Sequence, residues 1–556
     1  MIRVFIIFYF LQLSSILYAQ QAEKQAPLNW HLLDRTEDGF YGIGLEKAYS
    51  NILKNKAAKK EVLVAVIDSG IDTTHEDLKP VLWNNPREIP GNGVDDDKNG
   101  YIDDIHGWNF IGGKDGKNVS KDSYEGARVY YMYKSLFENV SDPSLITSAD
   151  KVKYQMYVRA KSQIEEQAKE ASMVVMLWKN MVEQLPAADS IIRKQWGNQV
   201  YNGDQLQTFK PINSEQQRAK SLLLGLFQSI AESGENAESF TNTKLIREIT
   251  DYYEGKKAAV DVSQKAPPDF RNSVVKDDYF NINDRYYGNN DIMGPDPRHG
   301  THVAGIIAAY RNNQIGIKGV ADHVKIMVLR AVPDGDEHDK DIANAIRYAV
   351  ENGAKVINMS FGKSFSPQKK WVDDAVRLAE SKGVLLIHAA GNESTNLDSS
   401  ENYPNPIIGD EKRKAGNWIT VGASGSTEEK LAAYFSNYSS KQVDVFAPGS
   451  SIYSTVPGGN TYDFESGTSM ASPVVAGLAA LILSRYPELS PAEVKKAIEK
   501  SASAISLLVG LPEKGGESIH KVPFSNLSKT GGIINAVEAL KEAEIMYNAK
   551  KRNQQP

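Results

Sequence analysis

The stretch Val62-Leu63-Val64-Ala65-Val66-Ile67, followed by Asp68-Ser69-Gly70, decides the fold of this chain. Six consecutive apolar residues, most of them β-branched, predict a short strand that is buried on both faces, as in a parallel sheet. Helical patterns occur at 341–351 and 371–381. Further apolar runs stand before, between and after them, at 324–332, 355–359, 384–388 and 418–421. This alternation predicts an α/β fold with a doubly wound, mostly parallel sheet, whose functional groups gather at the carboxyl ends of the strands.

The composition is that of an acidic, globular protein without cysteine. The chain has 556 residues and a formal net charge of −6. This charge argues against a nucleic-acid-binding protein, because such proteins need a basic face. The absence of cysteine excludes disulfides, thiolate metal sites and a cysteine nucleophile.

The N-terminus has the layout of a signal peptide. Arg3 is followed by an almost entirely apolar run from Val4 to Leu17, and Ala19 offers a small residue for cleavage. The alternative is an uncleaved membrane anchor, but the run is shorter than the roughly 20 residues that a spanning helix needs. We therefore expect an exported protein, periplasmic or extracellular, that is not inserted in a membrane after the signal is removed.

A long segment in the middle of the chain breaks the alternation of strands and helices. No Gly or Pro occurs from Ser144 to Leu185, and apolar residues recur there at helical spacing, which predicts a long helix. Two further helices are expected, one beginning near Ser214 and one from Lys244 to Glu254, ended by Gly255. The chain then divides into a signal peptide at 1–19, the first part of the α/β domain at 20–112, a helical insertion at 113–290, the rest of the domain at 291–545 and a polar tail at 546–556.

Four polar residues occupy positions where a chemical site is expected. Asp68 stands at the end of the first buried strand, and Asn392 also follows a buried strand. His299 opens a helix of small residues, and Ser469 lies near the start of an apolar helix. Taken singly, each has an ordinary explanation, such as a helix cap, a turn residue, a core histidine or a metal ligand. Together they supply a nucleophile, a base, an anion that orients the base and an amide donor for an oxyanion.

Five sequence blocks carry a resemblance to a known family. They are VAVIDSGID at 64–72, HGTHVAG at 299–305, INMSFG at 357–362, AAGNE at 389–393 and GTSMASP at 467–473. In this order they resemble the subtilisin-like serine peptidases, the subtilase family, over about residues 30–112 and 291–540. The resemblance implies a serine endopeptidase that hydrolyses polypeptides. It also implies that His302, the second histidine of its block, is a structural core residue.

The resemblance assigns a role to each residue of the site. It implies that Asp68 orients His299, that His299 is the general base and then the general acid, and that Ser469 is the nucleophile. The side-chain amide of Asn392 and the backbone N–H of Ser469 would form the oxyanion hole. The segment Ser360-Phe361-Gly362 would pair with the substrate backbone as an added strand.

Two features depart from the family pattern. About forty residues separate Ala19 from the first strand, too few for the folding-assisting prodomain that subtilases usually carry. The helical insertion is the other, and it could gate the cleft, assist folding, bind a partner or only add stability. The alternative functions are therefore a subtilase scaffold that acts mainly as a binding module through its insertion, and an esterase-like acyl transferase. The sequence does not indicate an oligomeric state.

Calcium is the metal that the sequence favours. The segment 95–104 carries carboxylate or amide oxygens at alternating positions and a glycine suited to a sharp turn, as in EF-hand-type loops, but lacks their distal Glu. Its candidate ligands are Asp95, Asp97, Asn99, Asp103 and Asp104. The alternative is an acidic surface turn. The resemblance implies a second calcium site, to which Asp77 and Asn313 would give side-chain oxygens. Calcium bound only to the folded state would brace a protein without disulfides.

Overall fold

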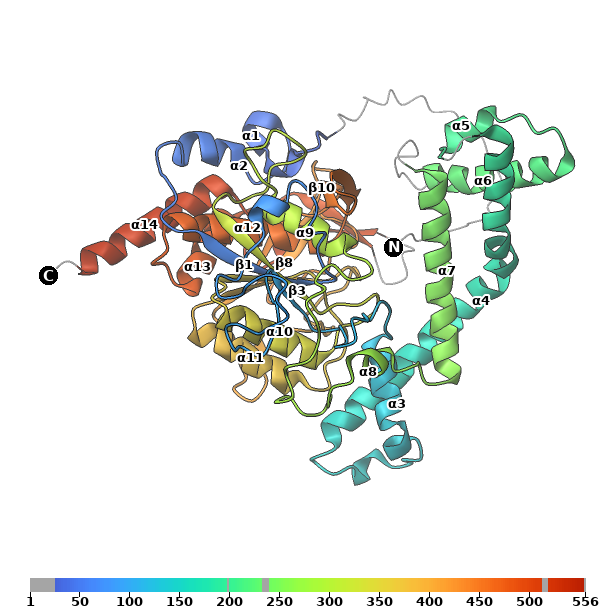
Figure 1. Ribbon diagram of the computed structural model, residues 1–556, viewed down its shortest axis with the longest axis horizontal. Helices are drawn as coiled ribbons and strands as arrows, with labels where there is room; N and C mark the ends of the chain where they lie inside the picture. Colours follow the sequence, from blue (N-terminus) through green and yellow to red (C-terminus); the bar gives the residue numbers. More distant parts are fainter. Residues whose placement is uncertain (1–25, 198–199, 233–239, 513–518, 555–556) are drawn as a thin grey trace. The chain divides into compact units, whose positions relative to one another are not determined.

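Figure 1 shows the computed structural model of the chain, which describes all residues except 1–25, 198–199, 233–239, 513–518 and 555–556. The signal peptide predicted at 1–19 lies outside the described residues. The described chain forms two compact units. One extends from Gly126 to Pro267, and the other comprises the residues on either side of that segment.

A nine-stranded sheet forms the centre of the larger unit. In spatial order it consists of β12 (Ser503–Ala504), β15 (Gly532–Ile533), β9 (Val445–Pro448), β8 (Trp418–Ser424), β5 (Leu385–Ala389), β4 (Val356–Met359), β1 (Val62–Asp68), β3 (Val324–Arg330) and β2 (Gly107–Asn109). Every neighbouring pair is parallel except β12 and β15. Val62 lies opposite Val324 on one side of β1, and Val64 lies opposite Val356 on the other.

Helices cover both faces of this sheet (Figure 1). Val62, Val64 and Val66 belong to one hydrophobic cluster, whereas Ala65 and Ile67 belong to another. The first cluster includes residues of α9 (Arg298–Ala308), α12 (Thr468–Arg485), α13 (Pro491–Ser501) and α14 (Ala536–Gln554), and the second includes residues of α10 (Asp339–Glu351) and α11 (Lys369–Ser381). Both faces of β1 are therefore buried, and the predicted α/β fold with a mostly parallel sheet is confirmed.

The central helix of this unit is α12, which packs against β1, β4, β5, β8 and β9. Among the described residues it is the one helix that is long and apolar enough to cross a membrane, and 94% of it is buried inside the protein. Its apolar sequence therefore reflects core packing. The helix begins at Thr468, so Pro473, which the sequence suggests for a first turn, lies in its second turn.

Short elements complete the larger unit. They are α1 (Arg35–Asp38), α2 (Leu45–Lys47), α8 (Phe270–Val275) and the antiparallel pairs β6 (Ile407–Ile408) with β7 (Arg413–Lys414), β10 (Ile452–Val456) with β11 (Thr461–Glu465), and β13 (Leu508–Pro512) with β14 (Ile519–Pro523). The segment 546–556, predicted as a polar tail, is helical as far as Gln554, because α14 continues through it. Buried Ala543 and Tyr547 pack this helix against the core.

The smaller unit is helical and has a hydrophobic core of its own. It consists of most of α3 (Glu125–Phe137) together with α4 (Lys151–Trp196), α5 (Gly203–Thr208), α6 (Ser214–Glu232) and α7 (Asn242–Gln264). Its core includes Leu185, Ile192, Leu206, Leu223 and Leu245. The expected long helix is present, but α4 continues through Pro186 and α7 continues through Gly255. Burial of Leu185 and Ala188 in α4, and of Tyr253 in α7, outweighs the low helix propensity of Pro and Gly.

The helical unit covers fewer residues than the insertion predicted at 113–290, because both flanks of that segment belong to the larger unit. Asn109 and Asn289 stand at the two flanks and pair with each other. The N–H of Asn109 donates to the carbonyl of Asn289 at 3.0 Å, and the reverse hydrogen bond measures 3.1 Å. Residues 113–125 and 268–290 are therefore part of the larger unit, in which Asn289 pairs with the last residue of β2.

Candidate active site

Asp68 and His299 form a direct contact at the carboxyl end of β1. The Nδ1 atom of His299 lies 2.7 Å from Oδ1 of Asp68, and the same oxygen accepts the N–H of Ser69 at 2.8 Å. His299 is the second residue of α9, and the next residue, Gly300, allows this approach. A Cβ atom at Gly300 would lie 2.2 Å from the carbonyl oxygen of Gly70. A side chain there would push the histidine away from the strand.

The charges around His299 favour its protonated form. Burial lowers the pKa of His299, but the charge and hydrogen bond of Asp68, followed by the charges of Glu465 and Asp296, outweigh it and raise the pKa to about 9. Oδ2 of Asp68 is buried and has no hydrogen-bond partner among the described residues. The Asp68 carboxylate therefore acts mainly on the imidazole.

Ser469 is the second residue of α12, at the end of the helix where backbone N–H groups have no partner within the helix. Its Oγ donates to the carbonyl of Ser360 at 3.0 Å, and Oγ of Ser360 donates back to the carbonyl of Ser469 at 2.9 Å. The amide of Asn358 donates to Oγ of Ser360 at 2.9 Å. These bonds join the start of α12 to the end of β4, and the Ser469 hydroxyl must leave the Ser360 carbonyl before it can give its proton to another base.

Asn392 is oriented by the residue that precedes Ser469. Its Oδ1 accepts hydrogen bonds from the backbone N–H and from the hydroxyl of Thr468, both at 2.9 Å, so that its NH2 group is the remaining polar end. A Cβ atom added at Gly467 would lie 3.5 Å from both Nδ2 of Asn392 and the backbone nitrogen of Ser469. Two donors therefore flank one small space, which suits a developing oxyanion near the positive end of a helix.

The segment Ser360-Phe361-Gly362 directly follows β4, as its place in the sequence predicts. The next residue, Lys363, already pairs with Tyr403, through backbone hydrogen bonds of 2.9 and 2.8 Å. Asn402 lies beside this segment: a Cβ atom at Gly362 would lie 2.5 Å from Oδ1 of Asn402, whose Nδ2 donates to the carbonyl of Ala390 at 2.9 Å. Asn402 therefore connects the two segments 360–362 and 389–393. Nothing in the sequence around it indicates this position.

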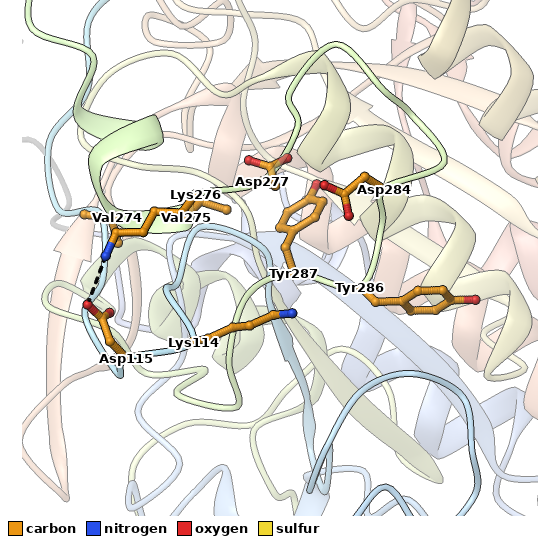
Figure 2. Close-up of a pocket in the computed structure, with 9 residues that line it drawn as sticks. All are labelled: Lys114, Asp115, Val274, Val275, Lys276, Asp277, Asp284, Tyr286 and Tyr287. Carbon is orange, nitrogen blue, oxygen red and sulfur yellow. Dashed lines mark hydrogen bonds and ion pairs between the residues drawn. The ribbon is translucent and has the colours of Figure 1, made fainter.

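A cavity of about 350 Å³ adjoins the Asp68–His299 pair. Its walls include Asp68, His299, Ser360, Arg298 and Glu465. Glu465 is a wall residue that the sequence did not suggest. A second cavity, of about 290 Å³, lies among residues 114–115, 274–277, 284 and 286–287, where Lys276 reaches toward Asp115 (Figure 2). That cavity contains none of the four predicted catalytic residues.

His302 lies in the core and not in the cavity. Its Nε2 is 3.0 Å from the carbonyl oxygen of Ile452 and 3.1 Å from that of Asp463. Burial lowers the pKa of His302 to about 3, so that the ring is neutral. This environment agrees with the structural role that the resemblance implies.

The acidic loop at 95–104 brings together only part of the predicted ligand set. Carboxylate oxygens of Asp95, Asp97 and Glu88 lie within 4.8 Å of one another, and Glu88 was not predicted. In contrast, Asp103 accepts the N–H groups of Gly91, Asn92 and Gly93 at 2.8, 3.2 and 2.8 Å. Asp104 accepts hydrogen bonds from the side chains of Asn85, Asn99 and Tyr348. Asp95 and Asp97 also accept the N–H groups of Asn99 and Gly100, so the whole set shapes the loop, and the mutual distances alone make Glu88, Asp95 and Asp97 the candidate group for a cation.

Asp77 and Asn313, the second predicted pair, also meet. The side-chain amide of Asn313 donates to Oδ1 of Asp77 at 2.5 Å, and Tyr462 donates its hydroxyl to Oδ2 at 3.2 Å. Asp77 is fully buried. The N–H of Ile317 also donates to Oδ2 of Asp77, at 3.3 Å, so Asn313 faces the carboxylate with its NH2 group and would have to turn its oxygen inward to bind a cation with Asp77.

Comparison with known proteins agrees with the sequence blocks. The thermophilic serine proteinase of Bacillus sp. (strain AK1) is 42% identical over 240 residues, which are 43% of this chain and 54% of that protein. Subtilisin E of Bacillus subtilis (strain 168) is 43% identical over 209 residues, which are 37% of this chain and 50% of that protein. The chain thus spans about half the length of these relatives. A solved protease structure from Pseudoalteromonas arctica is 28% identical, with a TM-score of 0.36 over 46% of this chain and 79% of that one.

The family profile gives the widest match. It is described as the subtilase family and covers residues 59–524, from just before β1 to the turn after β14. This range contains Asp68, His299, Asn392 and Ser469. Because the match extends over well more than half of the chain, this protein belongs to the subtilase family.

Proposed function

We propose that this protein is an exported serine endopeptidase that cleaves polypeptides through Asp68, His299 and Ser469. The observation that carries the proposal is the 2.7 Å contact between Asp68 and Nδ1 of His299. Ser469, at a helix start, is linked to the same site through Ser360, whose carbonyl accepts its hydroxyl and which lines the cavity next to His299. A contact on Nδ1 leaves Nε2 of His299 for proton transfer, which is the arrangement that serine attack requires.

The reaction proceeds in two steps. Oγ of Ser469 attacks the carbonyl carbon of the peptide bond and gives its proton to Nε2 of His299, and the oxyanion is stabilised by the amide of Asn392 and the N–H of Ser469. His299 then protonates the leaving amine, and the C–N bond breaks to give an acyl-enzyme. In the second step His299 takes a proton from water, the hydroxide attacks the ester, and Ser469 recovers its proton. Asp68 keeps the imidazole in the required tautomer and stabilises the imidazolium.

The substrate backbone would bind as an extended strand along Ser360-Phe361-Gly362. This segment follows a strand of the sheet and precedes Lys363, whose backbone is already paired with Tyr403. Main-chain hydrogen bonds to an added strand give affinity without much sequence selection. The proposed substrates are therefore unfolded or flexible segments of proteins.

Export and calcium binding belong to the same proposal. The N-terminal layout at 1–19 supports an exported, periplasmic or extracellular protein. Glu88, Asp95 and Asp97 would hold one calcium ion, and Asp77 and Asn313 would contribute to a second. A bound calcium ion would stabilise the folded chain and takes no part in the chemistry.

Hydrolysis of casein by the purified protein tests this function. We expect cleavage that a serine-directed inhibitor abolishes, and in Ser469→Ala we expect turnover to fall by about six orders of magnitude, the size of the loss known for the serine of subtilisin itself. The unfolding temperature should be nearly unchanged, because the Ser469 hydroxyl makes one hydrogen bond, to Ser360. The matched control is His302→Ala, which should lower stability more than turnover. Near-normal activity in Ser469→Ala would leave the alternative, a scaffold that mainly binds through its helical insertion.

A further inference from the structure

Glu465 and Arg298 connect the two parts of the chain that carry the nucleophile and the base. Arg298 directly precedes His299, and Glu465 is the last residue of β11, shortly before Ser469. Nε of Arg298 lies 2.9 Å from Oε1 of Glu465, and its Nη2 lies 2.7 Å from Oδ2 of Asp463. The start of α9 is thereby tied to the strand that leads into α12.

The hairpin of β10 and β11 holds α9 at further points. The hydroxyl of Thr455 donates to the carbonyl of Thr301 at 2.7 Å, and that of Ser454 donates to the carbonyl of His302 at 2.8 Å. A Cβ atom at Gly305 would collide with both hydroxyls, at 2.2 and 2.4 Å. Because the hairpin and the helix fit this closely, the carboxylate of Glu465 has a defined place on the wall of the cavity that His299 also lines.

Glu465 faces the same cavity as His299 and is mostly shielded from solvent. Its side chain is 19% exposed, and it makes no hydrogen bond to the imidazole. Burial raises the pKa of Glu465 and outweighs the charges of His299 and Arg298, which lower it; the histidine and the glutamate nevertheless each favour the charged form of the other. Glu465 therefore acts on His299 through space, and Arg298 holds the Glu465 carboxylate in position.

The surroundings of His299 contain more acidic than basic groups. They are Asp68 on β1, Asp296, Arg298 and His302 in and just before α9, Asp463 and Glu465 on β11, and Arg330 and Asp334 on and after β3. His302 is neutral, and Arg330 is buried, with hydrogen bonds to Ser69, Asn109 and Val119. Glu465 is thus, after Asp68, the carboxylate with the largest effect on the imidazole.

We propose that Glu465 is a positioning residue for the general base, a second carboxylate that stabilises the imidazolium of His299 and is held in place by Arg298. This inference rests on the proposed peptidase activity. During attack by Ser469 the imidazole becomes positively charged, and a fixed negative charge close to it lowers the energy of that state. The ion pair of Arg298 with Oε1 of Glu465 holds this charge on the wall of the cavity.

The pH profile of kcat/KM for a short peptide substrate tests the inference in Glu465→Gln. Removal of the negative charge lowers the pKa of His299, so the acid limb should move to lower pH, by about half a unit or more. At the plateau, kcat should fall several-fold with KM little changed, because the imidazolium is less stabilised. Glu465→Asp should restore part of both effects, since it returns the charge in a shorter side chain.

Two further variants make the result specific. Arg298→Gln removes a positive charge and should move the acid limb to higher pH, opposite to Glu465→Gln. Asp463→Asn also breaks a contact of Arg298 and should leave the limb nearly in place. An acid limb that stays where it is in both Glu465→Gln and Arg298→Gln, while both remain active and folded, overturns the inference. If the proposed peptidase mechanism is wrong, Ser469→Ala should keep normal turnover. This result distinguishes a failure of the proposed function from a failure of the inference about Glu465.

Discussion

The ammonium of Lys363 lies 2.8 Å from a carboxylate oxygen of Glu125 and 2.8 Å from one of Asp339, and all three side chains are at most 2% exposed. Glu125 is the last residue before the helical unit, and Lys363 follows the proposed substrate segment. At the other end of the insertion, the guanidinium of Arg271 lies 2.6 Å from Asp341. Asp339 and Asp341 both belong to the first turn of α10, so both ends of the insertion are fastened to the same helical turn.

Lys363→Met should destabilise the protein strongly. The substitution leaves Glu125 and Asp339 buried without their shared counter-charge, which costs about 3–5 kcal/mol in the free energy of unfolding. Denaturant unfolding measures this loss, and adding Glu125→Gln should recover part of it. Lys370→Met is the matched control, because its ion pair with Asp374 is exposed and should be worth less than about 1 kcal/mol. Equal effects of the two lysine substitutions would contradict the anchoring role.

Activity should rise with pH up to about 9. His299 accepts a proton only when it is neutral, and the surrounding charges raise its pKa to about 9. The raised pKa of His299 also stabilises the folded protein. This contribution to the free energy of unfolding is fully present below about pH 6.5, the pKa of histidine in the unfolded chain, and is lost as the pH rises through about 9. A pH series of kcat/KM checks the first effect, and a pH series of denaturant midpoints checks the second. A profile whose acid limb lies near pH 6.5 would contradict the raised pKa of His299.

Chelation of calcium should lower the unfolding temperature of the wild-type protein. Asp95→Asn with Asp97→Asn should remove much of this sensitivity, because it takes two carboxylates from the cluster with Glu88. Asp103→Asn is the control within the same loop. It should lower stability by weakening three backbone hydrogen bonds, yet leave the response to chelator intact. Melting curves that coincide with and without chelator in the wild type would argue against both proposed sites.

Replacing residues 126–267 with a short linker should give a folded peptidase. The variant keeps Glu125, which shares Lys363 with Asp339, and Arg271, which pairs with Asp341. It also keeps the pairing of Asn109 with Asn289, so the contacts that hold both flanks of the insertion in the larger unit remain. If the insertion restricts access to the cleft, the rate for a large protein substrate should increase relative to that for a short peptide. An unchanged ratio in a folded protein would leave the helical unit as a stabilising or partner-binding bundle.

The sequence was most informative where local pattern and burial coincide. The unbroken apolar run before Asp68 predicted a strand covered on both faces, and the small-residue blocks around His299 and Ser469 placed both at helix starts. Pro186 and Gly255 were misleading, because packing within the helical unit outweighs their intrinsic preferences. Glu88, Asn402 and Glu465 were missed for another reason. The importance of Asn402 and Glu465 depends on which distant segment lies beside them, which no spacing along the chain records, and Glu88 stands before the regular spacing of the acidic loop with which it clusters.

The position of β1 in the sheet has a consequence for synthesis of the chain. Its partner β3 follows about 260 residues later, and its other partner β4 later still. Because the chain is synthesised at about 5–20 residues per second, the edges and apolar faces of β1 remain unpaired for tens of seconds after they are made. The helical unit, whose contacts are largely local, can fold during that interval. Nascent β1 therefore stays unpaired until the insertion and β3 have been made, and slow translation of the insertion would prolong its exposure.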